Sequence, residues 1–215
     1  MTARSPLPAR ILIPVANPGT AEELIRLGAA MLDPRAGEVS ALGIVEVPEG
    51  MPLSEGATRA RHARRLLQKV LDYAPNGTPI HPIVRIGRHA AEGIIEAAAE
   101  QEADLIIFGW GGKAPLGSNG RNGGPTVFSP TIDEVVRESP CDIAVVKQRG
   151  SLKIERVLVP VRGGPHAELA IRFADAIATY HKATVVVLHL VPPGITMAVR
   201  AQAERALAEI GRAHV

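Results

Sequence analysis

The stretch RILIPVANPGTAEELIRLGAAMLDPRAGEVSALGIV, residues 10–45, combines a strand, a helix and a second strand. Its first seven residues form a short apolar run that stops before a proline and a glycine, which is typical of a buried parallel strand. A helix is predicted next, because Thr20 is a suitable N-cap and Glu23 follows three residues later, as in a capping box. A second strand is expected over 37–47. The stretch therefore indicates an α/β fold.

The same pattern recurs without a gap as RVLVPVRGGPHAELAIRFADAIATYHKATVVVLHLV, residues 156–191. Leu12 and Pro14 of the first copy align with Leu158 and Pro160 of the second. Two α/β units can look alike through composition alone, but an ungapped register through strand, helix and strand favours duplication of one unit.

The second copy is incomplete within this sequence, since Val215 aligns with Lys69 of the first copy. Counterparts of the later strands do not follow. We therefore expect a complete domain over 8–148 and a partial second domain over 153–215, which holds only the first two strand-helix units.

Beyond residue 45, strand and helix patterns keep alternating. Further helices are expected over 57–74, 88–101 and 131–138, and further strands over 79–87, 103–109 and 141–147. Five strands with interleaved helices predict a doubly wound parallel sheet, in which ligands bind beyond the carboxyl ends of the strands.

The composition sets limits on the class of protein. The chain has 215 residues, of which 46% are hydrophobic and 21% charged, with a formal net charge of +2. This is ordinary for a soluble protein of one or two domains, and the charge is too balanced to indicate nucleic-acid binding. A single cysteine, Cys141, forms no intramolecular disulfide and fits a reducing compartment. Without an apolar run of about 18 residues or a signal peptide, a cytoplasmic location is expected.

A glycine-rich segment, FGWGGKAPLGSNGRNGGPTVFSPTIDEVV (108–136), follows the fourth strand and leads into a helix. Glycines allow backbone N–H groups to approach phosphates closely, and a helix N-terminus adds a favourable dipole. The alternative interpretation is a glycine-rich surface loop without a ligand.

Four segments occur in a familiar order and spacing: IPVANP (13–18), VRIGRHAAEGIIEAA (84–98), ADLIIFGWGG (103–112) and VVRESPCDIAVVK (135–147). They resemble the universal stress protein family, over 8–148 in full and over 153–212 as a truncated copy. The dipeptide GW after the fourth strand and VLVPVRGGPHAELAIRFA at the start of the second copy resemble the subgroup fused to, or encoded with, amino-acid permeases and related transporters.

The resemblance implies a sheet in the order 3-2-1-4-5, often dimerised through the fifth strand. It also implies a regulatory or stress-response role, and many members bind ATP or a related adenine nucleotide. Their loop reads G-x2-G-x9-G-[S/T], and an acidic residue at the end of the first strand contacts the adenosine moiety.

This sequence departs from the family's nucleotide-binding pattern. Gly109 and Gly112 preserve G-x2-G, but Ser129-Pro130 stands where the family has Gly followed by Ser or Thr, after an insertion. Proline also removes one N–H donor. Ala16 replaces the acidic residue of the first strand, so weak or absent ATP binding is expected. If a nucleotide binds, the resemblance places its contacts at Pro14, Val15, Gly109, Gly112, Ser129 and Thr131.

Two functions therefore remain open. One is a sensor that binds an adenine nucleotide and signals to a transporter, and the other is a ligand-free interaction module. An enzyme is not expected, since no nucleophile–base pair or carboxylate pair occupies an active-site position. The seven histidines show no metal-ligand spacing.

Two surfaces bear on possible partners. The basic run RARHARRLLQK (59–69) is interpreted as a solvated helix face in preference to a membrane-facing one. In the second copy, RVLVPV (156–161) lacks a strand on one side, and an apolar open edge invites pairing. We therefore expect the second copy to pack on the first domain or to pair with another chain, making a homo-oligomer. The alternative is that the chain is a fragment whose missing residues complete the sheet. No nucleic-acid partner is expected.

Overall fold

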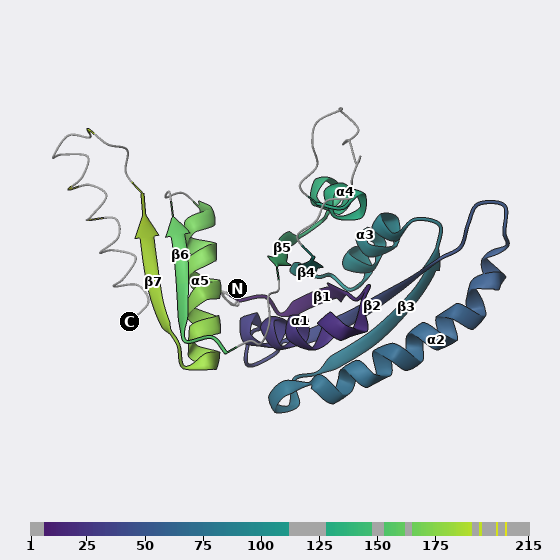
Figure 1. Ribbon diagram of the computed structural model, residues 1–215, viewed down its shortest axis with the longest axis horizontal. Helices are drawn as coiled ribbons and strands as arrows, with labels where there is room; N and C mark the ends of the chain where they lie inside the picture. Colours follow the sequence, from purple (N-terminus) through teal and green to yellow (C-terminus); the bar gives the residue numbers. More distant parts are fainter. Residues whose placement is uncertain are drawn as a thin grey trace, which may run out of the picture. The chain divides into compact units, whose positions relative to one another are not determined.

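The computed structural model describes residues 7–111, 128–147, 153–161 and 165–190, together with three single residues near the C-terminus. The chain forms two compact units, Met1–Ser151 and Leu152–Val215 (Figure 1). Among the described residues, no helix combines the length and the apolar character that crossing a bilayer requires. The glycine-rich residues 112–127, including the predicted Gly112, lie outside the described residues.

The first unit is a five-stranded sheet in the order β3-β2-β1-β4-β5, which confirms the predicted fold class and strand order. Every pair of neighbouring strands is parallel. The strands are β1 (Arg10–Pro14), β2 (Glu38–Glu46), β3 (Ile80–Gly87), β4 (Leu105–Trp110) and β5 (Asp142–Lys147). The helices are α1 (Pro18–Met31), α2 (Gly56–Gln68), α3 (Ala90–Glu100) and α4 (Pro130–Glu138), with short 3-10 segments η1 (Leu53–Glu55), η2 (Lys69–Tyr73) and η3 (Pro75–Gly77).

Helices cover both faces of the sheet, as predicted. On one face, a Cβ built on Gly28 of α1 would lie 3.1 Å from Ile13, and one built on Gly43 of β2 would lie 3.1 Å from Leu67 of α2. On the other face, a Cβ built on Gly93 of α3 would lie 3.0 Å from Ile44, the neighbour of Gly43 in β2. Because successive strand residues point to opposite faces, α1 and α2 lie on one side and α3 and α4 on the other.

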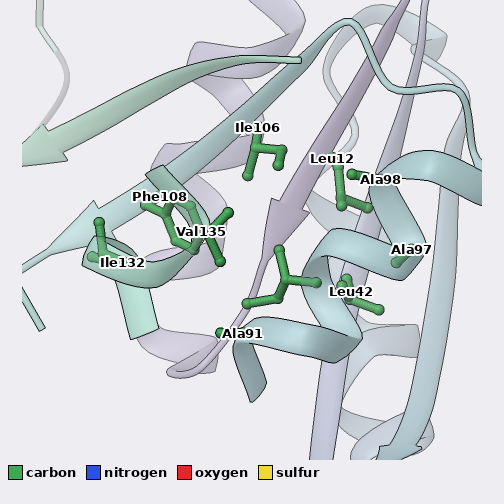
Figure 2. Packing of buried hydrophobic residues seen from close by; sticks show 10 residues of the cluster. Leu12, Leu42, Ala91, Ala97, Ala98, Ile106, Phe108, Ile132 and Val135 are labelled. Carbon is green, nitrogen blue, oxygen red and sulfur yellow. The ribbon is translucent and has the colours of Figure 1, made fainter. Parts of the chain in front are cut away.

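In the buried cluster under α3 and α4, the alanines of α3 and the larger Ile132 and Val135 of α4 pack on large strand residues (Figure 2). Its labelled members are Leu12, Leu42, Ile106 and Phe108 from the strands and Ala91, Ala97, Ala98, Ile132 and Val135 from the helices. The alanines of α3 bring this helix close to the sheet.

The start of α1 differs from the predicted capping box. Asn17 is the N-cap, and its side chain accepts a hydrogen bond from the N–H of Gly19 at 2.9 Å. Pro18 then occupies the first helical position, where its missing N–H costs nothing. Thr20 instead donates its hydroxyl to the carbonyl of Asn17. The N-cap of the helix therefore lies three residues before the predicted one.

The second unit contains two parallel strands, β6 (Arg156–Val161) and β7 (Thr184–His189), joined by α5 (Pro165–His181). One face of this small sheet packs on α5 through a cluster of Val159, Val161, Ala167, Ile171 and Ala174. Side chains on the opposite face, among them Leu158 and Leu188, are exposed.

Candidate functional site

The candidate site lies where β1 and β4 end. Pairing between these strands extends through Leu12 and Ile106 and does not continue to Pro14. After β1 the chain turns to α1 and β2, whereas after β4 it proceeds to α4 and β5 on the other side. This reversal of direction is the position at which open parallel sheets bind ligands.

At the end of β1, Pro14 and Val15 offer no backbone donor to a phosphate. Pro14 lacks an N–H, and the N–H of Val15 donates to the carbonyl of Leu42 at 2.8 Å. The next two residues, Ala16 and Asn17, are exposed, and the Asn17 side-chain oxygen already caps α1. The end of β1 therefore provides no carboxylate for the adenosine moiety.

Gly109 at the end of β4 has a packing role that sequence reasoning did not detect. A Cβ built at this position would lie 3.0 Å from Leu24 Cδ1 of α1, at the tight limit of real contacts. A Cβ built on Gly111, by contrast, meets no described atom within 4 Å. The absence of a side chain at Gly109 is thus explained by the close approach of α1, without a phosphate.

Ser129 is the N-cap of α4, and its hydroxyl oxygen accepts from the N–H of Ile132 at 3.4 Å. Its carbonyl accepts from the N–H of Asp133 at 3.0 Å. Pro130 occupies the first helical position and contributes no donor, and Asp133 adds negative charge to the first turn. Thr131, which follows Pro130, is half-buried. A helix N-terminus normally attracts anions, but here a carboxylate in the first turn opposes a phosphate.

An aromatic contact joins the two ends of the glycine-rich segment. The rings of Trp110 and Phe128 meet edge to face with centroids 5.3 Å apart, and Lys147 Nζ lies 5.0 Å from the centroid of Trp110. Trp110 and Lys147 are register partners on β4 and β5, so strand pairing sets this cation–π contact. The pairing is long-range, and the sequence carried no signal for Lys147.

Two hollows lie elsewhere, around the first turns of α3. One, of about 210 Å³, is lined by Ile44, Arg85, Ile86, Gly87, His89, Glu92, Gly93 and Glu96. The other, of about 240 Å³, is lined by His89, Glu92, Ile95, Glu96, Glu134 and Glu138. None of the predicted contact residues lines either hollow.

The chemistry around α3 does not suit a nucleotide. Glu46 Oε1 accepts from the N–H of Ala90 at 2.9 Å, so the chain's own carboxylate occupies the N-terminus of α3. The second hollow is lined mainly by carboxylates, which repel phosphate. In the part of the chain that the structure describes, no group of three or more His, Cys, Asp or Glu side chains is arranged to hold a metal ion.

Comparison with protein families gives a match to the universal stress protein family over residues 9–147 and 153–211. Among curated proteins, the Na(+)/H(+) antiporter NhaS5 of Synechocystis sp. is 30% identical over 185 residues. The alignment covers 85% of this chain and 26% of the antiporter, so the chain spans about a quarter of that protein's length.

Two solved structures align across both units. A universal stress protein from Archaeoglobus fulgidus is 16% identical and superposes with a TM-score of 0.65 over 94% of this chain and 73% of its own. A functionally unknown protein from Pseudomonas aeruginosa is 18% identical, with a TM-score of 0.60 over 97% of this chain and 69% of its own. At these identities, the likeness concerns the fold.

Proposed function

Because the chain belongs to the universal stress protein family, we propose that it is a regulatory module which acts by binding, not by catalysis, on a membrane cation transporter. The observation that carries this proposal is the alignment of 85% of the chain with part of a Na(+)/H(+) antiporter. A regulatory unit of this kind would work at the cytoplasmic face of the membrane. Association with an amino-acid permease remains a prediction, whereas this relative favours a cation antiporter.

Adenine-nucleotide binding belongs to the same proposal, but only as a weakened site at the ends of β1 and β4. The position at the carboxyl ends of β1 and β4 supports such a site. Three features weaken it: Ala16 supplies no carboxylate, Pro130 supplies no N–H, and Asp133 adds negative charge near any phosphate.

A hybrid antiporter tests the regulatory role. The region of the Synechocystis antiporter that aligns with this chain is replaced either by this chain or by a polar linker, and Na⁺/H⁺ exchange is measured in everted vesicles. The chain should restore the Na⁺ and pH dependence that the linker abolishes. If both hybrids transport alike, the chain does not regulate this class of transporter.

The exposed face of β6 and β7 favours a second candidate, a ligand-free interaction module. Leu158 and Leu188 of that face are 60% and 38% exposed, which suits contact with another protein surface. Mass spectrometry of small molecules released from the purified native chain separates the two candidates. A stoichiometric adenine nucleotide supports the sensor, and its absence together with self-association supports the module.

A further inference from the structure

The outer surface of α2 carries an uninterrupted group of cations. Its members, here called the α2 cations, are Arg59, Arg61, Arg64, Arg65 and the adjoining Lys69, and all five are exposed. No acidic residue occurs between Gly56 and Lys69. Among the described residues, none of the α2 cations forms an ion pair with a carboxylate. Their charge is therefore available to an external anion.

The helix is held firmly with this surface outward. Gly56 and Leu67 are buried, and a Cβ at Gly56 would lie 2.6 Å from Ile86 Cγ2 of β3, so α2 packs very closely on the sheet. Arg61, Arg65 and Lys69 follow one another at intervals of four, which places them along one stripe away from the buried residues.

Two exposed apolar side chains lie just before this helix. Met51 is 50% exposed, and Leu53, in η1, is 47% exposed. Only three residues separate Met51 from the N-cap Glu55 of α2. Basic residues beside exposed large apolar side chains are the combination that binds the interface of a bilayer.

The opposite face of the same unit is acidic. Figure 1 shows α3 and α4 on the other side of the sheet from α2. Their exposed carboxylates are Glu92, Glu96, Glu100, Glu134 and Glu138, which outnumber the cations here: Glu96 and Glu100 pair with Arg85, and α4 carries the exposed Arg137. The unit therefore carries positive charge on one side and negative charge on the other, and an anionic surface would orient it with α2 inward.

We propose that α2 docks the first unit on an anionic lipid bilayer, with the α2 cations at headgroup phosphates and with Met51 and Leu53 entering the interface. Clusters of four to eight Lys and Arg recognise anionic lipid in this way. The exposed methionine and leucine favour lipid over a nucleic acid, whose phosphates offer them no apolar environment. The inference does not depend on the proposed transporter or on a nucleotide.

The sequence alone favoured a solvated face for this helix. The structure adds three observations. The α2 cations have no carboxylate partner among the described residues, the exposed Met51 and Leu53 precede the helix, and the opposite face of the unit is acidic. The two charge observations point to an anionic surface, and the exposed Met51 and Leu53 point to an apolar interior beneath it.

Vesicle flotation with the full chain tests the proposal. The chain should float with vesicles of equal parts phosphatidylglycerol and phosphatidylcholine, and it should not float with phosphatidylcholine alone. Binding should be lost between about 50 mM and about 500 mM NaCl, since salt screens exposed charges. Equal binding to both vesicles, or binding that salt leaves unchanged, would overturn the proposal without any variant.

Two triple variants with the same change of charge give the matched comparison. R61Q/R65Q/K69Q should bind anionic vesicles roughly 100-fold more weakly, at about one order of magnitude for every one to two cations lost. R35Q/R137Q/R156Q, which removes three exposed cations elsewhere, should bind within about threefold of the wild type.

Two further measurements complete the test, one on Met51 and Leu53 and one with duplex DNA. M51S/L53S should weaken vesicle binding while leaving its salt dependence in place. Equal losses in the two triple variants would mean that net charge, not α2, drives binding. If duplex DNA binds in place of vesicles and depends on the same three cations, the surface is a nucleic-acid site and the proposal is wrong.

Discussion

Leu12 and Leu158 occupy the same position in two copies of one strand, yet Leu12 is fully buried and Leu158 is 60% exposed. The same holds for Leu42 and Leu188, which are 1% and 38% exposed. In the first unit, α3 and α4 cover this face. In the described part of the second unit, only α5 packs on the sheet, and it covers the opposite face.

The edge of β6 that faces away from β7 also has no strand partner in the described part of the chain. The carbonyl of Arg10 accepts from Asp104 next to β4, so residues at even positions of β1 direct their backbone groups toward β4. Arg156, Leu158 and Pro160 align with even positions of β1, so their backbone groups point away from β7. No described strand pairs with them there. Pro160 lacks an N–H, so this edge presents few donors. Contact through the apolar face is therefore the stronger route to association.

Self-association through this face is the first prediction. The full chain should sediment as a species larger than a monomer, and Leu158→Glu with Leu188→Glu should return it toward a monomer, because charges cannot be buried there unpaired. Val136→Glu, at an apolar position of α4 that is 50% exposed, is the control and should change nothing. A full chain that stays monomeric at every concentration tested would contradict the prediction.

The second prediction separates packing from phosphate binding at Gly109. Gly109→Ala should destabilise the first unit by about 1–3 kcal/mol, because the new methyl group meets the buried Leu24. Gly111→Ala, with no described atom within 4 Å of the added Cβ, should change stability by less than about 1 kcal/mol. Urea unfolding followed through the single tryptophan, Trp110 in β4, reports on this unit alone.

A double variant tests whether the contact with Leu24 is the cause of this destabilisation. In a Leu24→Ala background, Gly109→Ala should cost less, since the two side chains share one space. Equal costs in both backgrounds would show that Gly109 is required for something other than its contact with Leu24.

The sequence predicted the strands and their order well, because parallel strands buried on both faces are continuous apolar runs. It was less accurate at helix ends. The α-helix expected over 57–74 ends at Gln68, and 3-10 turns follow as far as Tyr73. The sequence did not reveal this boundary, because an amphipathic pattern persists through both kinds of turn. Pro18 at the first position of α1 moved the cap from Thr20 to Asn17, a competition between two good caps that spacing alone does not decide.

The site was only partly predictable. Local spacing located the ends of β1 and β4 and the start of α4. The role of Ser129 as a cap depends on the local geometry at Ile132. The contact between Gly109 and Leu24, like that between Trp110 and Lys147, depends on elements far apart in sequence, which no local pattern reveals.

The third prediction restores a carboxylate to the end of β1. The wild-type chain should bind ATP weakly, and Ala16→Asp should strengthen binding roughly tenfold or more, the value of a hydrogen bond to a charged group. Ala16→Asn, which has the same size without the charge, should gain less. Calorimetric titration measures all three, and a wild-type dissociation constant below about 1 μM would contradict this account of the site.

The fourth prediction concerns Cys141, which lies just before β5 and is the only cysteine. Burial raises the pKa of its thiol from the usual 9.0, and this outweighs the opposing hydrogen bond from Ser139. Alkylation by iodoacetamide should therefore be slow near neutral pH and faster in urea, because only the thiolate reacts. A rate in the native chain that equals the rate in urea at the same pH would contradict it.

The raised pKa of Cys141 also determines how the free energy of unfolding changes with pH. The folded chain holds the thiol proton more tightly than the unfolded chain, so this contribution is fully present below pH 9.0 and is lost as the pH rises through the higher, folded-state pKa. The free energy of unfolding of the wild type should therefore fall relative to that of Cys141→Ala as the pH is raised above 9.0, and the difference should be constant below it. Urea unfolding of both chains across this range measures the difference. A difference that grows in favour of the wild type at high pH would mean that the thiolate, not the thiol, is the form stabilised beside Ser139.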